Sequence, residues 1–202
     1  AMMNIRTNYE EHSEDCNAYL DSQQHPKRET ESATLPTEER AAQKPFVVAD
    51  CLYGFACNPC TFACPHGAIV KRDTRSVPEI DYTKCVGCME CVTHCPGLAI
   101  FGYDKSRSTI FLPVEYSVEK GALVWLVDNN GKKLGEGSIL SVIAKPNKTN
   151  LCRVKCDNLY EGTITDVRGF IVKENYPEAI EWKGVEDASA AAAYVCHCED
   201  IP

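Results

Sequence analysis

Thirteen cysteines dominate the sequence, and their spacing is the first sign of chemistry. One run has the spacing CxxCxxCxxxCP and consists of Cys85, Cys88, Cys91, Cys95 and Pro96. This is the spacing of 4Fe-4S ligation, in which three cysteines bind one cluster and the fourth binds another. Thiolates suit iron because they are soft, strongly donating ligands. The run therefore predicts iron-sulfur clusters and one-electron chemistry.

A second cysteine run lies upstream of the first, at an offset of 31 residues. The matched positions are Asp50 and Asp81, Cys57 and Cys88, Cys60 and Cys91, Cys64 and Cys95, and Ala68-Ile69 and Ala99-Ile100. Such self-similarity indicates two copies of one small unit. We expect each copy to run strand, ligand loop, short helix, strand, with strands at 46–48 and 68–70, then at 78–80 and 98–101. A region of about 58 residues buries little apolar surface, so bound clusters should contribute much of its folding free energy.

The upstream run departs from the pattern at its first ligand. Five residues separate Cys51 from Cys57, whereas two separate the corresponding cysteines downstream. Gly54, which lies opposite Cys85 in the repeat, would let the chain fold back and bring Cys51 to the cluster. We therefore expect Cys51 to ligate. Otherwise the first cluster would be 3Fe-4S or carry an unusual ligand, and Asp50 is the adjacent candidate.

The last cysteine of each run is expected to cross to the other cluster. The predicted ligand sets are Cys51, Cys57, Cys60 and Cys95 for the first 4Fe-4S cluster, and Cys85, Cys88, Cys91 and Cys64 for the second. This crossing would bring the two clusters close enough for electron transfer. Pairs of CxxC also bind zinc in general, but the Cys-Pro endings and the paired repeat favour iron and sulfide. Because every ligand position holds a cysteine, no open catalytic iron site is expected.

Three other cysteines are interpreted as non-ligands. Cys152 and Cys156 would share one face of a strand at a separation of about 13 Å, too far for one small metal site. We expect them to pack in a core. Cys16 is a lone thiol in a polar segment and is expected to be uninvolved.

Two histidines and two tryptophans are candidates for roles around the clusters. His66 and His94 follow or precede the last cysteine of each run and could tune a potential by hydrogen bonding. An ordinary surface or packing role is the favoured interpretation. Trp125 and Trp182 are interpreted as core or interface residues.

The segment after the cysteine runs has the pattern of a small antiparallel β domain. Asn130-Gly131 tolerates the positive φ angles of a type I′ turn, so residues 122–144 predict a two-stranded hairpin. Further strands are predicted at 150–156 and 162–172. Ala-rich residues near 190 predict a short helix or linker.

We therefore expect an α+β protein in which two copies of one small unit precede a small antiparallel β domain. The predicted organisation is a polar tail at 1–45, the two-cluster domain at 46–105, a small β domain at 106–175, and a linker, helix and Cys-x-Cys tail at 176–202. The tail carries nine acidic and five basic side chains and could wrap around a partner.

Residues 46–103 resemble the bacterial two-cluster ferredoxins, and that resemblance implies a ferredoxin-like pseudo-twofold domain and one-electron transfer. A narrower resemblance rests on Cys57-Asn58-Pro59-Cys60 with the displaced Cys51, on the sequence CPGLAIF at 95–101, and on Val167-Arg168-Gly169. Together these look like the iron-sulfur subunits of multi-subunit FAD-dependent dehydrogenases of the proline and hydroxyproline type. That resemblance implies a hetero-oligomer in which a partner subunit carries the flavin.

The C-terminal Cys196-His197-Cys198 is similar to the start of a bacterioferritin-associated-ferredoxin-like domain. Such domains use Cys-x-Cys and a later Cys-x2-Cys, and the later pair does not occur before Pro202. Cys196 and Cys198 are therefore candidate ligands of a shared or incomplete 2Fe-2S site. The alternatives are a truncated chain, a site completed by another subunit, and a vestigial motif.

Composition limits the compartment and the partners. Apolar residues make up 44% of the 202 positions, with no apolar run near membrane-spanning length, and the start does not resemble a secretory signal. A cytoplasmic location is expected. The net charge of −8 and the lack of a dense Lys/Arg run argue against a nucleic-acid partner and suit docking to a basic protein.

No dinucleotide fingerprint, Walker loop or nucleophile elbow occurs in the sequence, so no catalytic site of its own is expected. The favoured function is a relay of single electrons between a flavin in a partner dehydrogenase subunit and a downstream acceptor. The rivals are a freely diffusing ferredoxin-type carrier and, in another class, a zinc-stabilised interaction module.

Overall fold

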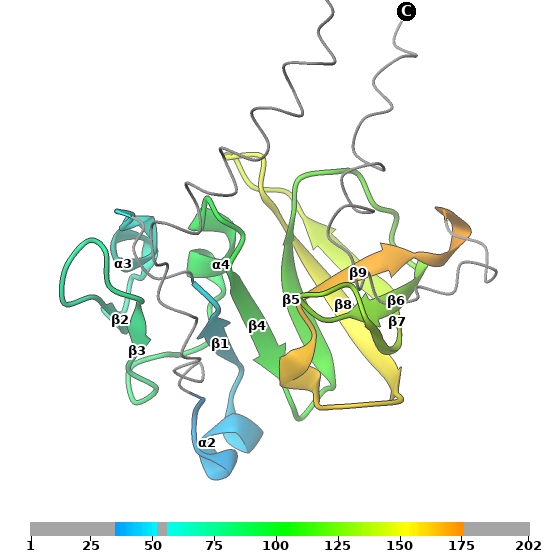
Figure 1. Cartoon of the computed structure of the whole chain (residues 1–202), viewed down its shortest axis with the longest axis horizontal. Coiled ribbons are helices and arrows are strands. Elements are labelled where there is room, and N and C mark those ends of the chain that lie inside the picture. Colours follow the sequence, from blue (N-terminus) through cyan, green and yellow to red (C-terminus); the bar gives the residue numbers. More distant parts are fainter. Residues whose placement is uncertain (1–34, 52–55, 176–202) are drawn as a thin grey trace, which may run out of the picture. The chain divides into compact units, whose positions relative to one another are not determined.

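The structure, a computed structural model, describes residues 35–51 and 56–175 (Figure 1). Its helices are α2 (Glu38–Gln43), α3 (Pro59–Ala63) and α4 (Glu90–His94), with 3-10 helices η1 (Ile164–Asp166) and η2 (Lys173–Asn175). Its strands are β1 (Phe46–Ala49), β2 (Ile69–Val70), β3 (Glu79–Ile80), β4 (Ile100–Asp104), β5 (Thr109–Val114), β6 (Leu123–Val127), β7 (Lys133–Ile143), β8 (Asn150–Leu159) and β9 (Gly169–Val172). Cys16, Trp182, Cys196 and Cys198 lie outside the described residues.

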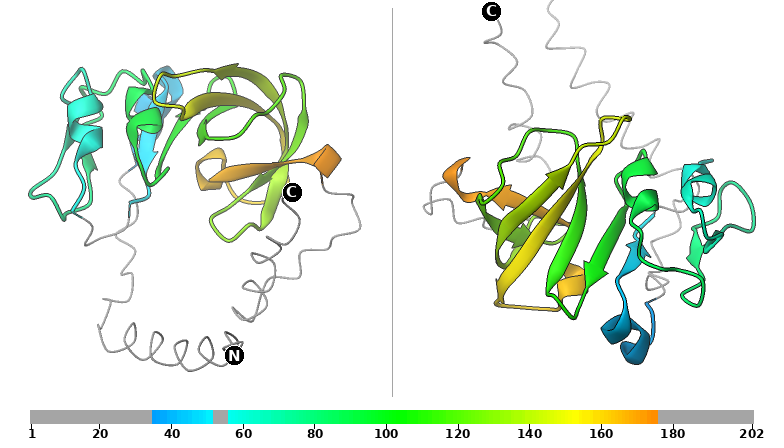
Figure 2. Two further views of the ribbon diagram at one scale, coloured as in Figure 1. Left: turned by 90° about the horizontal axis from the view of Figure 1, so that it is seen from above. Right: turned by 180° about the vertical axis from the view of Figure 1, so that it is seen from behind.

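Seven of the strands form one antiparallel sheet in the order β1-β4-β5-β8-β7-β6-β9, and β2 pairs with β3 separately. In Figures 1 and 2, β1 and β4 lie between the cysteine-rich α3–β2–β3 segment and the strands β5 to β9. The pairing of β4 with β5 joins the two parts through a tight turn. The position predicted as a domain boundary, 105/106, therefore falls in a hairpin turn of a continuous sheet.

The cysteine-rich part has strands at all four predicted positions. The first strand of the upstream copy, β1, pairs with the last strand of the downstream copy, β4, and β2 pairs with β3. Matched hydrogen bonds cross between the copies: Asp50 N–H donates to Ala99 O, and Asp81 N–H to Ala68 O, both at 2.8 Å. The 31-residue repeat is thus present in the backbone pairing as well as in the spacing of the cysteines.

Apolar side chains and cysteines share the core of this part. Val47, Ile69, Ile80, Val92 and Ile100 form one buried cluster with Cys60, Cys85 and Cys91. Met89 joins it at 3% exposure, and a β-carbon on Gly102 would lie 2.2 Å from the Met89 sulfur. Gly102 in β4 therefore leaves the space that Met89 fills at the start of α4.

The predicted hairpin at 122–144 is confirmed by the pairing of β6 with β7. Its turn is not type I′, because only Gly131 has a positive φ, of 77°. Asp128 Oδ1 instead accepts the N–H groups of Asn130 and Lys132, and Gly131 N–H donates to Asp128 O at 3.2 Å. A longer loop with glycine in the left-handed conformation results, which is the next most common hairpin connection.

The strand predicted at 162–172 is shorter in the structure. Thr163 and Asp166 form a capping box that starts η1, so the chain turns before β9 begins at Gly169. Because the Asp166 carboxylate accepts the Thr163 N–H at 2.7 Å, the local polar contact competes with strand pairing.

The prediction of an irregular polar tail over 1–45 is wrong at its end, where α2 forms. Thr37 caps this helix by accepting the Arg40 N–H at 3.3 Å, and Glu38 and Glu39 lie in the first turn, where carboxylates are favourable. Ala41 is buried, so α2 packs on the domain. None of the helices in the described ranges is long and apolar enough to cross a membrane.

Candidate iron-sulfur centre

Each cysteine run ends in a five-residue helix. Cys60 lies in α3 and Cys64 at its C-cap, while Cys91 lies in α4 and Cys95 at its C-cap. Pro59 begins α3, a position where its missing N–H costs no helical hydrogen bond. The two helices contact each other, so all four cysteines lie around one interface.

Backbone amides donate to the sulfur of the last cysteine in each run. Ala68 N–H donates to Cys64 Sγ and Ala99 N–H to Cys95 Sγ, both at 3.3 Å. The two bonds occupy equivalent places in the repeat. Hydrogen bonds to cluster sulfurs are one means by which a protein sets a reduction potential.

The first predicted ligand set comes together around Cys51 and Cys60. Burial raises the pKa of the Cys51 thiol most, and the nearby charges of Cys95 and Cys57 raise it further. The pKa of Cys60 is raised by burial and by Cys95, Cys57 and Cys51. Lys71 opposes these effects at both thiols. Cys95, which belongs to the downstream run, thus lies beside the cysteines of the upstream run.

The second predicted set comes together around Cys91. Burial raises the pKa of its thiol strongly, and the charges of Cys85, Cys88 and Cys64 add to the effect. Cys64 comes from the upstream run, so the exchange between the runs is reciprocal. The ligand sets remain predictions, and the neighbours of each thiol are those that the crossed spacing requires.

These residues fit two 4Fe-4S clusters in number and in chemistry. Buried thiols with raised pKa values hold protons at neutral pH, and coordination to iron replaces those protons. The described residues contain no group of three or more His, Cys, Asp or Glu side chains arranged to hold a single metal ion. A cube of iron and sulfide is held at its corners, so its thiolates need not converge on one point. When bound, such clusters accept and release single electrons.

Asp50, the alternative ligand named beside Cys51, is held by residues of the segment that contains strands β5 to β9, which we call the β region. Arg168 Nε donates to Asp50 Oδ2 at 3.1 Å, and the side chains are 15% and 19% exposed. Asn129 in the β6–β7 turn also donates to this carboxylate. Arg168 further donates to the Tyr103 hydroxyl at 2.8 Å and lies over the ring of Phe101. The contact fixes the chain next to Cys51 from a position 118 residues away.

Two cations that the sequence analysis did not single out lie beside the ligand loops. Lys71 Nζ donates to the Cys57 carbonyl, and Arg40 Nη2 donates to the Cys85 carbonyl at 2.6 Å. The signal was present in the sequence, because Arg40 and Lys71 are themselves 31 residues apart. Neither residue belongs to the matched cysteines and strands that define the repeat, so the cysteine spacing alone does not reveal the pair.

The remaining candidate residues have different places. Cys152 is fully buried, as the core interpretation predicts, and burial raises its pKa to about 12. Cys156 is partly buried on the same strand. His66 and His94 are both exposed, and His94 Nδ1 lies 2.7 Å from Glu90 O. Trp125 lies in β6, under the ammonium groups of two lysines, Lys133 and Lys173.

Comparison with known proteins supports the site. Residues 53–100 match the 4Fe-4S dicluster domain family. A selenate reductase subunit of Mesobacillus selenatarsenatis is 50% identical over 38 residues, which are 19% of this chain and 13% of that protein. The beta subunit of chlorate reductase from Ideonella dechloratans is 39% identical over 66 residues, 32% of this chain and 20% of that protein.

A third relative is smaller. Pyruvate synthase subunit PorD of Methanocaldococcus jannaschii is 43% identical over 44 residues, 22% of this chain and 50% of that protein. The chain thus covers half or less of the length of each of these relatives. No solved structure matches the chain. Together, the family match and the two groups of thiols define residues 53–100 as a 4Fe-4S dicluster domain.

Proposed function

We propose that this chain is the electron-transfer subunit of an oxidoreductase complex. In this proposal it relays single electrons between a flavin in a partner dehydrogenase subunit and a downstream acceptor, and it has no catalytic site of its own. We also propose the α+β class for the whole chain, with residues 46–105 as a ferredoxin-like pseudo-twofold domain.

The observation that carries the proposal is the interleaving of the two thiol groups. Cys95 of the downstream run lies with the first group, and Cys64 of the upstream run lies with the second. Two clusters held in this way would share the α3–α4 interface and form a short path for electrons. A protein that only bound iron for stability would not need two interleaved sites.

The choice of a subunit is supported by the relatives and by the added β region. The selenate and chlorate reductase proteins are both named as subunits. Strands β5 to β9 extend the sheet of the two-cluster part, and Arg168 links them to the residue before Cys51. A diffusing carrier would not need this extension. The flavin and an amino-acid substrate are proposed from the narrower resemblance to proline and hydroxyproline dehydrogenase subunits.

The two helices differ in how they are covered, which favours α3 as the face for a partner. In the repeat, Phe62 of α3 corresponds to Thr93 of α4. Phe62 is 85% exposed, whereas Thr93 is 1% exposed and its carbonyl accepts the Asn147 side chain at 2.6 Å. The β7–β8 loop thus covers α4 and leaves α3 open. An exposed phenylalanine between two predicted ligands, Cys60 and Cys64, suits a contact through which electrons pass.

Anaerobic purification from the native source, with iron, sulfide and flavin measured in whatever co-purifies, tests the proposal. We expect about eight irons per chain, two four-iron clusters, in a complex that contains flavin. The same iron in a flavin-free monomer would instead establish the diffusing carrier. A colourless protein that contains zinc would overturn both electron-transfer functions. Iron clearly above eight would point to the Cys196 and Cys198 site.

A further inference from the structure

We propose that Arg40 and Lys71 form a matched pair of cations that raise the reduction potentials of the two clusters, Lys71 that of the first and Arg40 that of the second. The inference rests on the proposed electron-transfer function only in requiring that both clusters are bound. In this proposal, two residues outside the cysteine motifs set the reduction potentials along the relay.

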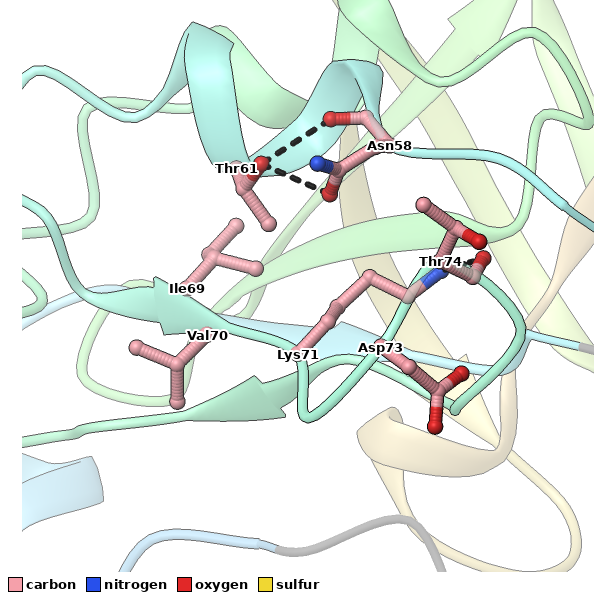
Figure 3. Close-up of a pocket in the computed structure, with 7 residues that line it drawn as sticks. All are labelled: Asn58, Thr61, Ile69, Val70, Lys71, Asp73 and Thr74. Carbon is pink, nitrogen blue, oxygen red and sulfur yellow. Dashed lines mark hydrogen bonds between the residues drawn. The ribbon is translucent and has the colours of Figure 1, made fainter.

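Lys71 is held against the first ligand loop. Its ammonium group donates to Cys57 O at 2.5 Å and to Thr74 O at 2.9 Å. The Cys57 N–H also donates to Thr74 O, at 3.0 Å, so the loop and the lysine meet at one point. Figure 3 shows the Lys71 side chain extending toward Thr74, and Asn58, the residue that follows Cys57, lines the same pocket. The ammonium group is thereby held within hydrogen-bonding distance of the backbone of a predicted ligand of the first cluster.

Arg40 is held against the second ligand loop. Its guanidinium donates to Cys85 O at 2.6 Å and to Tyr82 O at 3.1 Å. A further bond to Lys44 O, at 2.9 Å, ties the same group to the end of α2. The planar guanidinium therefore bridges the helix and the ligand loop, in a geometry that a flexible ammonium group would match poorly.

The two cations occupy equivalent positions in the repeat, although their acceptors differ: Lys71 reaches Cys57, the counterpart of Cys88, whereas Arg40 reaches Cys85. Arg40 precedes β1 of the upstream copy and reaches the loop of the downstream copy, whereas Lys71 precedes β3 of the downstream copy and reaches the loop of the upstream copy. The 31-residue offset between them is that of the cysteines. The same reciprocal crossing therefore governs the ligands and the cations, although one cation is an arginine and the other a lysine.

Electrostatics gives the direction of the effect. Reduction adds one negative charge to a cluster, so a cation held nearby favours the reduced form. Through partly buried protein, one charge held next to a ligand loop changes the equilibrium between the oxidised and reduced cluster by about tenfold, or ~59 mV for a one-electron couple. Removing either cation should lower the potential of its own cluster by about that amount and leave the other nearly unchanged.

Redox titration of the full chain under anaerobic conditions, followed by electron paramagnetic resonance, measures both potentials. The variants are Lys71→Met and Arg40→Met, with Arg72→Met and Lys44→Met as matched controls, because these neighbouring cations are exposed. Lys71→Arg should retain the potential, since it keeps the charge. Lys71→Gln removes the charge but keeps a donor for the Cys57 carbonyl. The signal that survives in Cys88→Ser identifies the first cluster.

The expected result is a fall of about tenfold in the reduced fraction of the first cluster in Lys71→Met and Lys71→Gln, and of the second in Arg40→Met. Equal shifts of both clusters, no shift, or the same shift in the controls would overturn the proposal. Loss of the first cluster from both Lys71→Met and Lys71→Gln would show a purely structural role and would also overturn it. These potentials can be measured whether or not a flavin subunit co-purifies. The result therefore tests this inference separately from the proposed function.

Discussion

The two ligand loops descend from one repeat, yet they are held in different ways. Asp81, before the downstream loop, caps its own turn: its carboxylate accepts the N–H and the hydroxyl of Thr83, at 3.0 and 2.6 Å. Asp50, its counterpart, is held by Arg168 and Asn129 from the β region. The aspartate before the downstream loop is therefore held locally, whereas the aspartate before the upstream loop is held by residues far along the chain.

The difference follows from the displaced first ligand. In the downstream loop Cys85 N–H donates to Asp81 O at 2.9 Å, which completes a turn around the first ligand. In the upstream loop the first cysteine has moved to the position next to Asp50. Long-range contacts from Arg168 and Asn129 hold Asp50 there. The β region is thus part of the support of the first site and not an independent appendage.

The largest expected effect is the loss of one cluster, which would break the equivalence of the two sites. Cys88→Ser replaces a predicted ligand of the second cluster, and the iron content should fall from about eight to about four per chain. Cys152→Ser is the matched control, because this buried cysteine lies in β8. It should keep all the iron. Iron lost from Cys152→Ser, or full iron in Cys88→Ser, would contradict the ligand assignment.

The next largest effect should come from cutting the long-range support of the upstream loop. Arg168→Met removes a cation that contacts the mostly buried Asp50 carboxylate, which should cost about 2 kcal/mol of unfolding free energy. The first cluster should be lost more readily than the second. Denaturant unfolding and the iron signals of the two clusters measure both effects.

Lys132→Met is the control for this variant, because it breaks an ion pair with Glu161 in which both side chains are more than half exposed. Such a surface pair contributes little, on the order of 0.5 kcal/mol. If Arg168→Met weakened both clusters equally, the proposed dependence of the upstream loop alone on the β region would be wrong.

These loops also mark what the sequence could and could not predict. The 31-residue repeat located β1, β2, β3 and β4, because cluster ligation fixes the spacing of the chain between its ligands. The crossed neighbours of Cys95 and Cys64 follow from the same spacing. The hairpin of β6 and β7 was evident from its apolar strands and its glycine turn.

Contacts between distant residues were beyond the sequence. Nothing in the spacing relates Arg168 to Asp50, since their contact depends on how β9 packs against β6. The length of β9 was overestimated because the side chain of Asp166 stops the strand locally. The polar composition of residues 1–45 indicates a tail, so the sequence analysis does not predict α2, although Thr37 with the following glutamates is a capping signal.

A third prediction sharpens the difference between the open α3 and the covered α4. Phe62→Ser should weaken binding of the partner subunit about tenfold and slow electron transfer, because an exposed aromatic contact is lost. Leu123→Ser, at a 57% exposed position in β6, is the control and should bind normally. Dissociation constants of the purified subunits provide the measurement. Normal binding by Phe62→Ser would show that the partner subunit does not dock on α3.

The smallest expected effect concerns the local cap of the downstream loop. Hydrogen bonds from Thr83, and then Lys84, lower the pKa of Asp81 to about 2 from an ordinary value of 3.8. Because the folded pKa is depressed, the carboxylate contributes stability that is fully present above about pH 4 and lost as the pH falls toward 2.

Asp81→Asn should therefore be slightly less stable than the natural protein at pH 6, and the gap in unfolding free energy between the two should narrow between about pH 4 and 3. Unfolding free energies across this range measure the gap, and Asp73→Asn serves as a second exposed turn carboxylate outside the ligand loops. A gap that stayed constant down to about pH 3 would mean that Asp81 acts through its shape and not through its charge, and the two loops would then differ less than their contacts indicate.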